Sequence, residues 1–171
     1  MMVVLIIVVV IAAFLGFSAT KPGDFAIRRS TTIKAGPEKI QPLIADFHKW
    51  GGWSPWEKID ADLKRTYEGS PSGVGAIYGW EGKKAGTGRM EITGATPTEV
   101  KIDLDFLKPM KASNKTVFAM EPSGGETKLT WTMSGQQPFM AKVMSTFFSM
   151  DKLVGKDFEA GLAGLKTLAE G

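Results

Sequence analysis

Few residues in this chain are suited to nucleophilic or acid–base chemistry. It has one histidine, His48, and no cysteine, which excludes disulfides, thiolate nucleophiles, cysteine-based zinc sites and a helical HExxH motif. Ser54 lies in a tryptophan-rich stretch, HKWGGWSPWEK (48–58), where no base is spaced to activate it. We therefore interpret Ser54 as a turn residue and His48 as a residue that favours a helix C-terminus. No catalytic constellation is predicted.

The acidic and glycine-rich clusters also have structural interpretations. Glu57, Asp60 and Asp62 follow the tryptophans, and a solvated loop accounts for them, because a metal site needs more ligands that converge. Four glycines between residues 73 and 82 lack the following helix and GK[ST] of a phosphate loop. They indicate bulges or sharp bends of a curved sheet. We therefore predict neither a bound metal nor a cofactor.

Length and charge limit the function classes further. The chain has 171 residues, of which about 150 remain once a hydrophobic N-terminus is removed, and this fits one domain. The formal net charge is +3, the charges are interspersed, and no basic run alternates with aromatic residues. Nucleic-acid binding is therefore not expected. No protein partner can be identified from the sequence.

The N-terminal segment is typical of a membrane anchor. Residues 1–17, MMVVLIIVVVIAAFLGF, carry no charged or polar side chain and make a helix of roughly 26 Å at ~1.5 Å per residue. We predict a single-pass transmembrane anchor over residues 1–19 and a linker over 20–23. No Lys or Arg precedes the apolar run, which favours an uncleaved anchor over a signal peptide. Lys21, Arg28 and Arg29 follow it and slightly favour a cytoplasmic domain; cleavage and orientation stay open.

The remaining chain predicts one α+β domain over residues 24–170. FAIRRSTTI (25–33) indicates a strand, and PEKIQPLIADFHKW (37–50) has the apolar spacing of a helix. Period-two alternation then runs to about Met133, clearest in EVKIDLDF (99–106), and divides into six strands. A long helix is predicted from Pro138. The pattern therefore predicts a seven-stranded curved antiparallel sheet wrapped around a long C-terminal helix.

One long helix cannot cover such a sheet at every point, so we predict an internal apolar cavity. Its expected ligand-binding residues come from three places: the inward-facing positions of the strands, the apolar side of the C-terminal helix, and the tryptophan-rich stretch. They are Trp53, Trp56, Tyr78, Trp80, Met90, Leu104, Phe106, Phe118, Trp131, Met140, Met144 and Phe148. The methionines suit a deformable wall, although a core stripe explains them too. A packing corner is the alternative for the tryptophans near residue 53.

Three stretches resemble the START/birch-pollen-allergen-like (SRPBCC) superfamily, in its polyketide cyclase/dehydrase-like branch. They are RRSTTIKAGPEKIQPLIADFHKW (28–50), WGGWSPWEK (50–58) and KDFEAGLAGLKTLAE (156–170). The resemblance covers about residues 24–169 and implies a helix-grip fold. It does not specify chemistry, because the superfamily includes lipid transfer, polyketide cyclisation and chaperone regulation.

Three functions are considered. We favour a membrane-tethered, non-catalytic domain that binds a hydrophobic or amphipathic small molecule or lipid, with Arg29, Tyr78 and Thr116 as candidate internal polar groups. The first alternative is a polyketide cyclase or dehydratase-like enzyme, for which Arg29, Tyr78 and Glu91 are the candidates. The second is a stress or assembly interaction module, which an exposed apolar patch around Trp53 and Trp56 would favour. The sequence does not identify the ligand or the oligomeric state.

Overall fold

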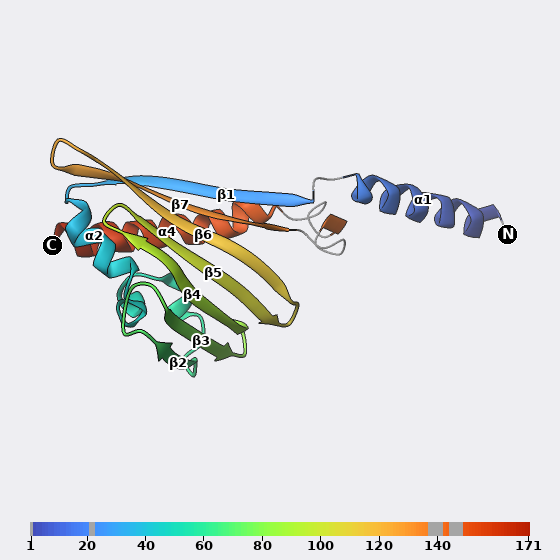
Figure 1. The fold of residues 1–171 in the computed structure, drawn as a ribbon. Helices are drawn as coiled ribbons and strands as arrows, with labels where there is room; N and C mark the ends of the chain where they lie inside the picture. The colour runs from blue at the N-terminus through green and yellow to red at the C-terminus, as the bar shows by residue number, and fades with distance from the viewer. Residues whose placement is uncertain (1, 21–22, 137–141, 144–148) are drawn as a thin grey trace.

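Seven antiparallel strands form one curved sheet (Figure 1). The structure is a computed structural model that describes residues 2–20, 23–136, 142–143 and 149–171. Its strands are β1 (Asp24–Ile33), β2 (Lys64–Gly69), β3 (Ala76–Gly82), β4 (Gly86–Thr96), β5 (Glu99–Lys108), β6 (Ala112–Ser123) and β7 (Glu126–Gln136). Their order in the sheet is β1-β7-β6-β5-β4-β3-β2. The predicted seven-stranded antiparallel sheet is confirmed.

Alternation along each strand divides the sheet into an inner and an outer face. In β5, Val100 and Ile102 are buried, whereas Lys101 between them is exposed. Cross-strand register carries the pattern through the sheet, since Ile102 pairs with Thr116 of β6 and Ile92 of β4. The apolar side chains therefore collect on the inner face, as the period-two pattern predicted.

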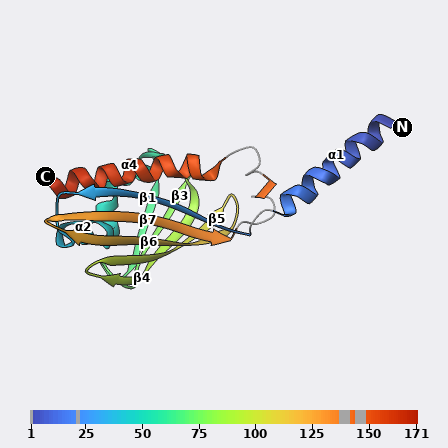
Figure 2. The ribbon, with the colours of Figure 1, turned by 90° about the horizontal axis from the view of Figure 1, so that it is seen from above.

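Helix α4 (Met150–Glu170) packs on the inner face and runs beside β1 (Figures 1 and 2). Its residues Phe158, Leu162 and Leu165 are almost completely buried, at spacings of three and four that place them on one side of the helix. Ser149 caps it by accepting a hydrogen bond from the backbone N–H of Lys152. The predicted C-terminal helix is thus present over residues 150–170, and most of its predicted first part lies outside the described residues.

The helix predicted over residues 37–50 is wrong in its extent. Helix α2 (Pro37–Ile44) ends early, and two 3₁₀ segments follow, η1 (Phe47–Gly52) and η2 (Pro55–Lys58). Asp46 has extended backbone geometry, and its carboxylate accepts a hydrogen bond from the backbone N–H of His48. This side-chain cap starts a new turn and so ends the α-helical path. His48 therefore lies at the start of η1 and not at a helix C-terminus.

Helix α1 (Met2–Ala19) precedes the sheet and projects away from it at the end where β1 begins (Figure 1). We call this end of the sheet the α1 end; β4 and β6 also begin there, and β3, β5 and β7 end there. Among the described residues, no helix combines the length and the apolar character that a membrane crossing requires. The structure therefore gives no support to the membrane span predicted over residues 1–19.

Candidate functional site

The inner face changes character along the strands, and this locates the candidate site. Far from the α1 end, Phe118 and Trp131 pair across β6 and β7 under α4. Closer to the α1 end, cross-strand pairing aligns one row of inner-face residues across six strands: Phe25, Gly135, Asn114, Leu104, Met90 and Tyr78. We call this set the Asn114 row. It marks the boundary between a closed and a more open part of the inner face.

The closed part is filled by aromatic side chains. The rings of Trp131 and Phe158 stack with centroids 4.1 Å apart, and Phe118 and Trp53 contact the same indole at 4.6 and 5.7 Å. All four are at most 4% exposed. Gly164 of α4 lies so close that a Cβ would stand 2.8 Å from the carbonyl oxygen of Trp53. These residues pack against one another in the core. Contact of a ligand with Trp53, Phe118 or Trp131 stays a prediction.

Burial decreases toward the α1 end of β5. Ile102 is 1% exposed, Leu104 and Phe106 are half-buried, and Leu107 is 47% exposed. Trp80 lies beside them, with its ring centroid 5.8 Å from that of Phe106, and its indole Nε1 donates to the carbonyl oxygen of Ala85 at 3.2 Å. Leu104, Phe106 and Trp80 were all predicted ligand-binding residues. The structure brings them together as a half-buried apolar surface beside the buried Met90.

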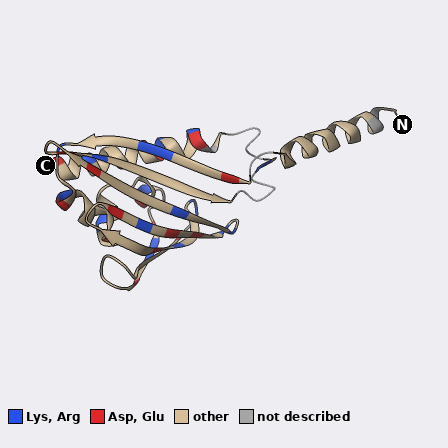
Figure 3. Cartoon of the chain, turned by 45° about the horizontal axis from the view of Figure 1, so that its top comes forward, with Lys and Arg blue, Asp and Glu red and all other residues tan. Residues whose placement is uncertain are grey.

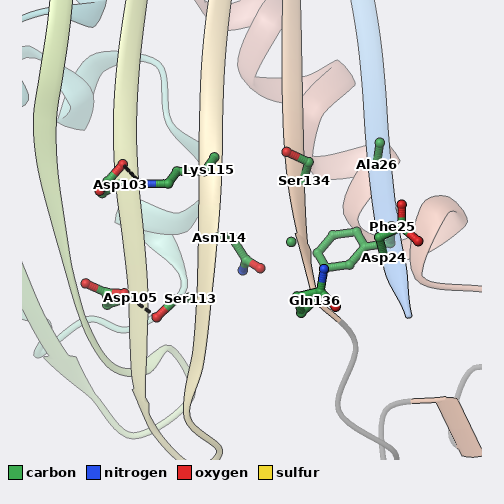
Figure 4. A pocket seen from close by; sticks show the side chains of 11 residues that line it. Asp24, Phe25, Ala26, Asp103, Asp105, Ser113, Asn114, Lys115, Ser134 and Gln136 are labelled. Atoms are coloured by element: carbon green, nitrogen blue, oxygen red, sulfur yellow. Dashed lines mark hydrogen bonds and ion pairs between the residues drawn. The ribbon is translucent and has the colours of Figure 1, made fainter. Parts of the chain in front are cut away.

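A pocket of about 550 Å³ opens at the α1 end, between β1, β7, β6 and β5 (Figure 4). Most of its lining is polar and lies on the outer face, where Lys115 contacts Asp103 at 2.6 Å and the Ser113 hydroxyl donates to Asp105 at 2.6 Å. Phe25, Asn114 and Gly135 of the Asn114 row also line it. None of the predicted ligand-binding residues does, and the pocket was not foreseen from the sequence.

Asn114 is the residue of the inner face that points to a ligand. It is 7% exposed, and its side-chain oxygen Oδ1 has no hydrogen-bond partner among the residues that the structure describes. A buried acceptor left unpaired costs about 1–3 kcal/mol, and such groups in native proteins call for an explanation. Gly135 makes the arrangement possible, because a Cβ at that position would overlap with Asn114 Oδ1. The sequence signal for this group is an amide two residues before Thr116, at a position that alternation places on the inner face, and it was not predicted as a site residue.

Tyr78 belongs to a buried network of hydrogen bonds with Glu57 of η2. Its hydroxyl donates to Glu57 Oε1 at 2.5 Å, and Arg65 Nε donates to Glu57 Oε2 at 2.6 Å. Burial, together with the hydrogen bond to Glu57, raises the pKa of Tyr78 well above its ordinary value near 10. The Glu57 side chain is only 7% exposed, so its assignment to a solvated loop was wrong. The network joins η2 to β2 and β3.

Asp60 also has a structural task that the sequence analysis did not predict. Its Oδ2 atom accepts hydrogen bonds from the backbone N–H groups of Lys84 and Ala85, with N–O distances of 2.9 and 2.7 Å. It therefore holds the turn between β3 and β4. Asp62, by contrast, is exposed, as expected for a solvated loop.

The other candidate catalytic residues do not converge. Arg29 lies between β1 and α4, where it contacts Asp151 at 3.0 Å and Glu159 at 2.8 Å. These hydrogen bonds raise the pKa of Arg29, and the bond to Arg29 lowers the pKa of Asp151. Glu91 pairs with Arg89 on the outer face at 2.6 Å. Arg29 thus fastens α4 to the sheet, and Glu91 stays away from the inner face.

His48, Ser54 and the tryptophan loop have structural surroundings. The His48 ring stacks on Tyr67 with centroids 4.1 Å apart, and its Nδ1 lies 3.0 Å from Asp46 Oδ1. Ser54 is buried. Trp53 donates its indole N–H to the carbonyl oxygen of Leu43 at 3.0 Å, so it offers no exposed patch of the kind that an interaction module would favour. Among the described residues, no group of three or more His, Cys, Asp or Glu could hold a metal ion.

The remaining predicted site residues divide into two sets. Trp56 is half-buried against Trp131 and Phe158, with ring centroids 5.6 and 6.0 Å away. Met140, Met144 and Phe148 lie outside the described residues, so their predicted contact with a ligand stays a prediction.

A curved antiparallel sheet that holds one C-terminal helix defines a helix-grip domain. The model of the family described as "Polyketide cyclase / dehydrase and lipid transport" matches residues 24–170, so the chain belongs to this family. The resemblance to the SRPBCC superfamily is thereby confirmed. A search of curated protein sequences gave no match.

Solved structures share the fold at low sequence identity. The crystal structure of protein CV1439 from Chromobacterium violaceum aligns with a TM-score of 0.61 and 14% identity, over 85% of this chain and 97% of that one. The solution structure of the Aha1 dimer from Colwellia psychrerythraea gives 0.60 and 17%, over 85% and 96%. DynU16, from the dynemicin biosynthetic locus, gives 0.57 and 13%, over 83% and 46%. At these identities the likeness shows the fold alone.

Proposed function

We propose that the domain binds a hydrophobic or amphipathic small molecule or lipid on the inner face at the α1 end, without catalysing a reaction. The observation that carries this proposal is the buried Oδ1 of Asn114, which lies among half-buried apolar side chains and has no hydrogen-bond partner in the described part of the chain. Binding sites of this kind are mostly apolar and contain a few polar groups that set orientation. The family description, which includes lipid transport, supports the same class of ligand.

The chemistry of the site narrows the ligand. Phe25 and Leu104 flank the amide in the Asn114 row, and a ligand chain that covers them gains about 25 cal/mol for each Å² of apolar surface removed from water. The Oδ1 atom can only accept a hydrogen bond. The ligand should therefore carry a hydroxyl, amine or amide N–H next to an apolar chain. A carboxylate would place two acceptors against each other.

The enzyme alternative has less support from the same geometry. Its three candidates are each engaged elsewhere: Arg29 with α4, Glu91 with Arg89, and Tyr78 with Glu57. A tyrosine whose pKa is raised keeps its proton at neutral pH, so Tyr78 is a hydrogen-bond donor and a poor general base. We therefore favour binding over cyclisation or dehydration.

Membrane attachment through α1 belongs to the same proposal. The helix has 18 residues and no charged side chain (Figure 3). Most of its described apolar side chains, such as Ile7, Val10 and Phe17, are more than half exposed. Apolar surface of this extent needs a cover, and we propose lipid as that cover, with the domain on the cytoplasmic side. Alkaline extraction of membranes tests it: retention of the chain supports attachment, and its release contradicts it.

Ligand binding is tested by native mass spectrometry of the full chain, purified in a mild detergent. We expect additional masses that solvent extraction removes and identifies as donor-bearing amphiphiles. An Asn114→Leu variant should retain fewer of them than the parent, whereas Ser113→Ala, on the adjacent outer-face position, should retain the same amount. A parent chain that carries no apolar molecule and is stabilised by none in a lipid panel would contradict the proposal.

A further inference from the structure

Two strand-connecting turns at the α1 end form a continuous basic and apolar surface. The first spans residues 82–86, which connect β3 and β4 and have the sequence GKKAG. The second spans residues 107–111, which connect β5 and β6 and have the sequence LKPMK. We call them the β3–β4 tip and the β5–β6 tip. Together they carry four lysines, two exposed apolar side chains and no acidic residue.

The two tips lie against each other. Thr87, at the start of β4, pairs with Lys108 at the end of β5. Gly86 has a positive φ of 70° and lies so close to the carbonyl oxygen of Lys108 that a Cβ would overlap with it. The β3–β4 tip is also fixed from the other side, because Asp60 accepts hydrogen bonds from two of its backbone N–H groups. The backbones that carry the four lysines are therefore held next to each other.

The lysines of both tips are free to meet an external anion. Lys83, Lys84, Lys108 and Lys111 are exposed and, within the described part of the chain, form no ion pair. Lysines elsewhere in the sheet behave differently: Lys115 and Lys101, for example, each contact a carboxylate within 3 Å. Leu107 and Met110 add apolar side chains that are 47% and 58% exposed.

Two hairpin turns at the opposite end of the sheet lack this combination. The turn from β4 to β5 is Thr96-Pro97-Thr98-Glu99, and the turn from β6 to β7 is Ser123-Gly124-Gly125-Glu126. Neither contains a lysine or a large apolar side chain. The asymmetry matters because α1 attaches only at the lysine end: its last residue, Ala19, is five residues before Asp24, which allows at most about 18 Å of extended chain.

We propose that the two tips form a docking surface for the headgroups of anionic phospholipids, which turns the α1 end of the domain, with the Asn114 row, toward the membrane. Lysines near an anionic bilayer are attracted to it, and apolar side chains between them enter the interfacial region. The proposed lipid attachment of α1 brings the same end of the sheet to the bilayer surface. The inference rests on that attachment for its orientation and not on ligand binding.

The cysteine-free chain allows a direct test. The full chain is prepared with a single cysteine, either Met110→Cys on the β5–β6 tip or Ser123→Cys on the β6–β7 turn, and each is labelled with an environment-sensitive fluorophore. It is reconstituted into nanodiscs of phosphatidylcholine, alone or with phosphatidylglycerol, that contain a lipid-borne quencher. We expect quenching at position 110 to rise with phosphatidylglycerol, and position 123 to stay unquenched. Equal quenching at both positions, or no dependence on phosphatidylglycerol, would overturn the proposal.

Charge reversal provides the matched comparison. Lys108→Glu with Lys111→Glu should abolish the phosphatidylglycerol dependence, whereas Lys39→Glu with Lys128→Glu, at the opposite end, should preserve it. Loss of the dependence in both pairs would indicate nonspecific attraction and contradict a defined surface.

A chain that fails to enter nanodiscs would refute attachment by α1, but it would not show whether the two tips bind anionic phospholipids. Flotation with phosphatidylglycerol vesicles then decides it: the parent chain should float, and each lysine removed from the tips should lower partitioning about fivefold. A parent chain that stays at the bottom of the gradient would refute the docking surface.

Discussion

Replacing Asn114 by leucine should stabilise the unliganded domain and weaken its ligand binding. The two side chains have nearly the same shape, so the change mainly exchanges the amide for two methyl groups. Asn114 Oδ1 is buried and has no hydrogen-bond partner within residues 2–20, 23–136, 142–143 and 149–171, and leucine has no acceptor to leave unpaired. Sites that are strained or polar for the sake of a ligand commonly trade stability against function.

The magnitudes follow from that single atom. An unpaired buried acceptor costs about 1–3 kcal/mol, and a chain of 171 residues shifts its Tm by about 2–4 °C per kcal/mol. Asn114→Leu should therefore raise the Tm of the unliganded protein by roughly 2–12 °C. The lost hydrogen bond to a ligand is worth about 0.5–1.5 kcal/mol, which weakens binding about 2- to 12-fold.

The assay compares two ligands of equal chain length. Monooleoylglycerol carries hydroxyl donors, and methyl oleate carries none, so only the first can donate to Asn114. Thermal unfolding is recorded with increasing amounts of each, for the parent, Asn114→Leu and Ser113→Ala. We expect the leucine variant to lose affinity for monooleoylglycerol relative to methyl oleate, and Ser113→Ala to match the parent. A leucine variant that melts earlier than the parent, or that binds both ligands with an unchanged ratio, would refute the reasoning.

Three further predictions concern the contacts that hold the domain together. Glu57→Gln should lower the free energy of unfolding by about 1–3 kcal/mol in chemical denaturation, because it weakens two hydrogen bonds to a buried carboxylate; a neutral result would contradict its burial. Gly164→Ala should cost about 1–3 kcal/mol, since its Cβ would approach the Trp53 backbone, and unfolding at unchanged denaturant would argue against that contact. Arg29 lowers the pKa of Asp151, so this ion pair stabilises the fold above about pH 4 and is lost as the pH falls through the lowered pKa; Asp151→Asn should reduce the loss of Tm on acidification, and identical acid profiles would disprove the linkage.

In the strands, the sequence pattern correctly predicted which side chains face inward. The alternation in EVKIDLDF placed Val100, Ile102, Leu104 and Phe106 on the inner face, and the register of β5 with β4 and β6 agrees. Successive side chains of any strand point to opposite faces, so this pattern can be recognised in the sequence without knowledge of the tertiary structure. Local backbone effects were less visible: the side-chain cap by Asp46 ended α2 six residues earlier than the apolar spacing indicated.

Partners distant in the sequence were beyond the reach of such patterns. Glu57 looked like one of three acidic loop residues, and only the folding of η2 over β2 and β3 gave it Arg65 and Tyr78 as partners. Arg29 was expected inside a cavity, and α4, more than 120 residues away, supplies its two carboxylates. The alternation placed Phe118 and Trp131 on the inner face, and only the tertiary structure adds Phe158, whose ring stacks against the indole of Trp131.

The sequence by itself determined that this chain makes a curved antiparallel sheet around a C-terminal helix, because hydrophobic alternation and helical spacing specify which side of each element is buried. It also excluded thiol and histidine-rich metal chemistry, because composition needs no fold. Only the tertiary structure decided which part of the inner face is packed and which part is open. That depends on how α4 packs against β1 and β7 and on a buried amide beside a glycine, both of which arise from contacts between segments far apart in the chain.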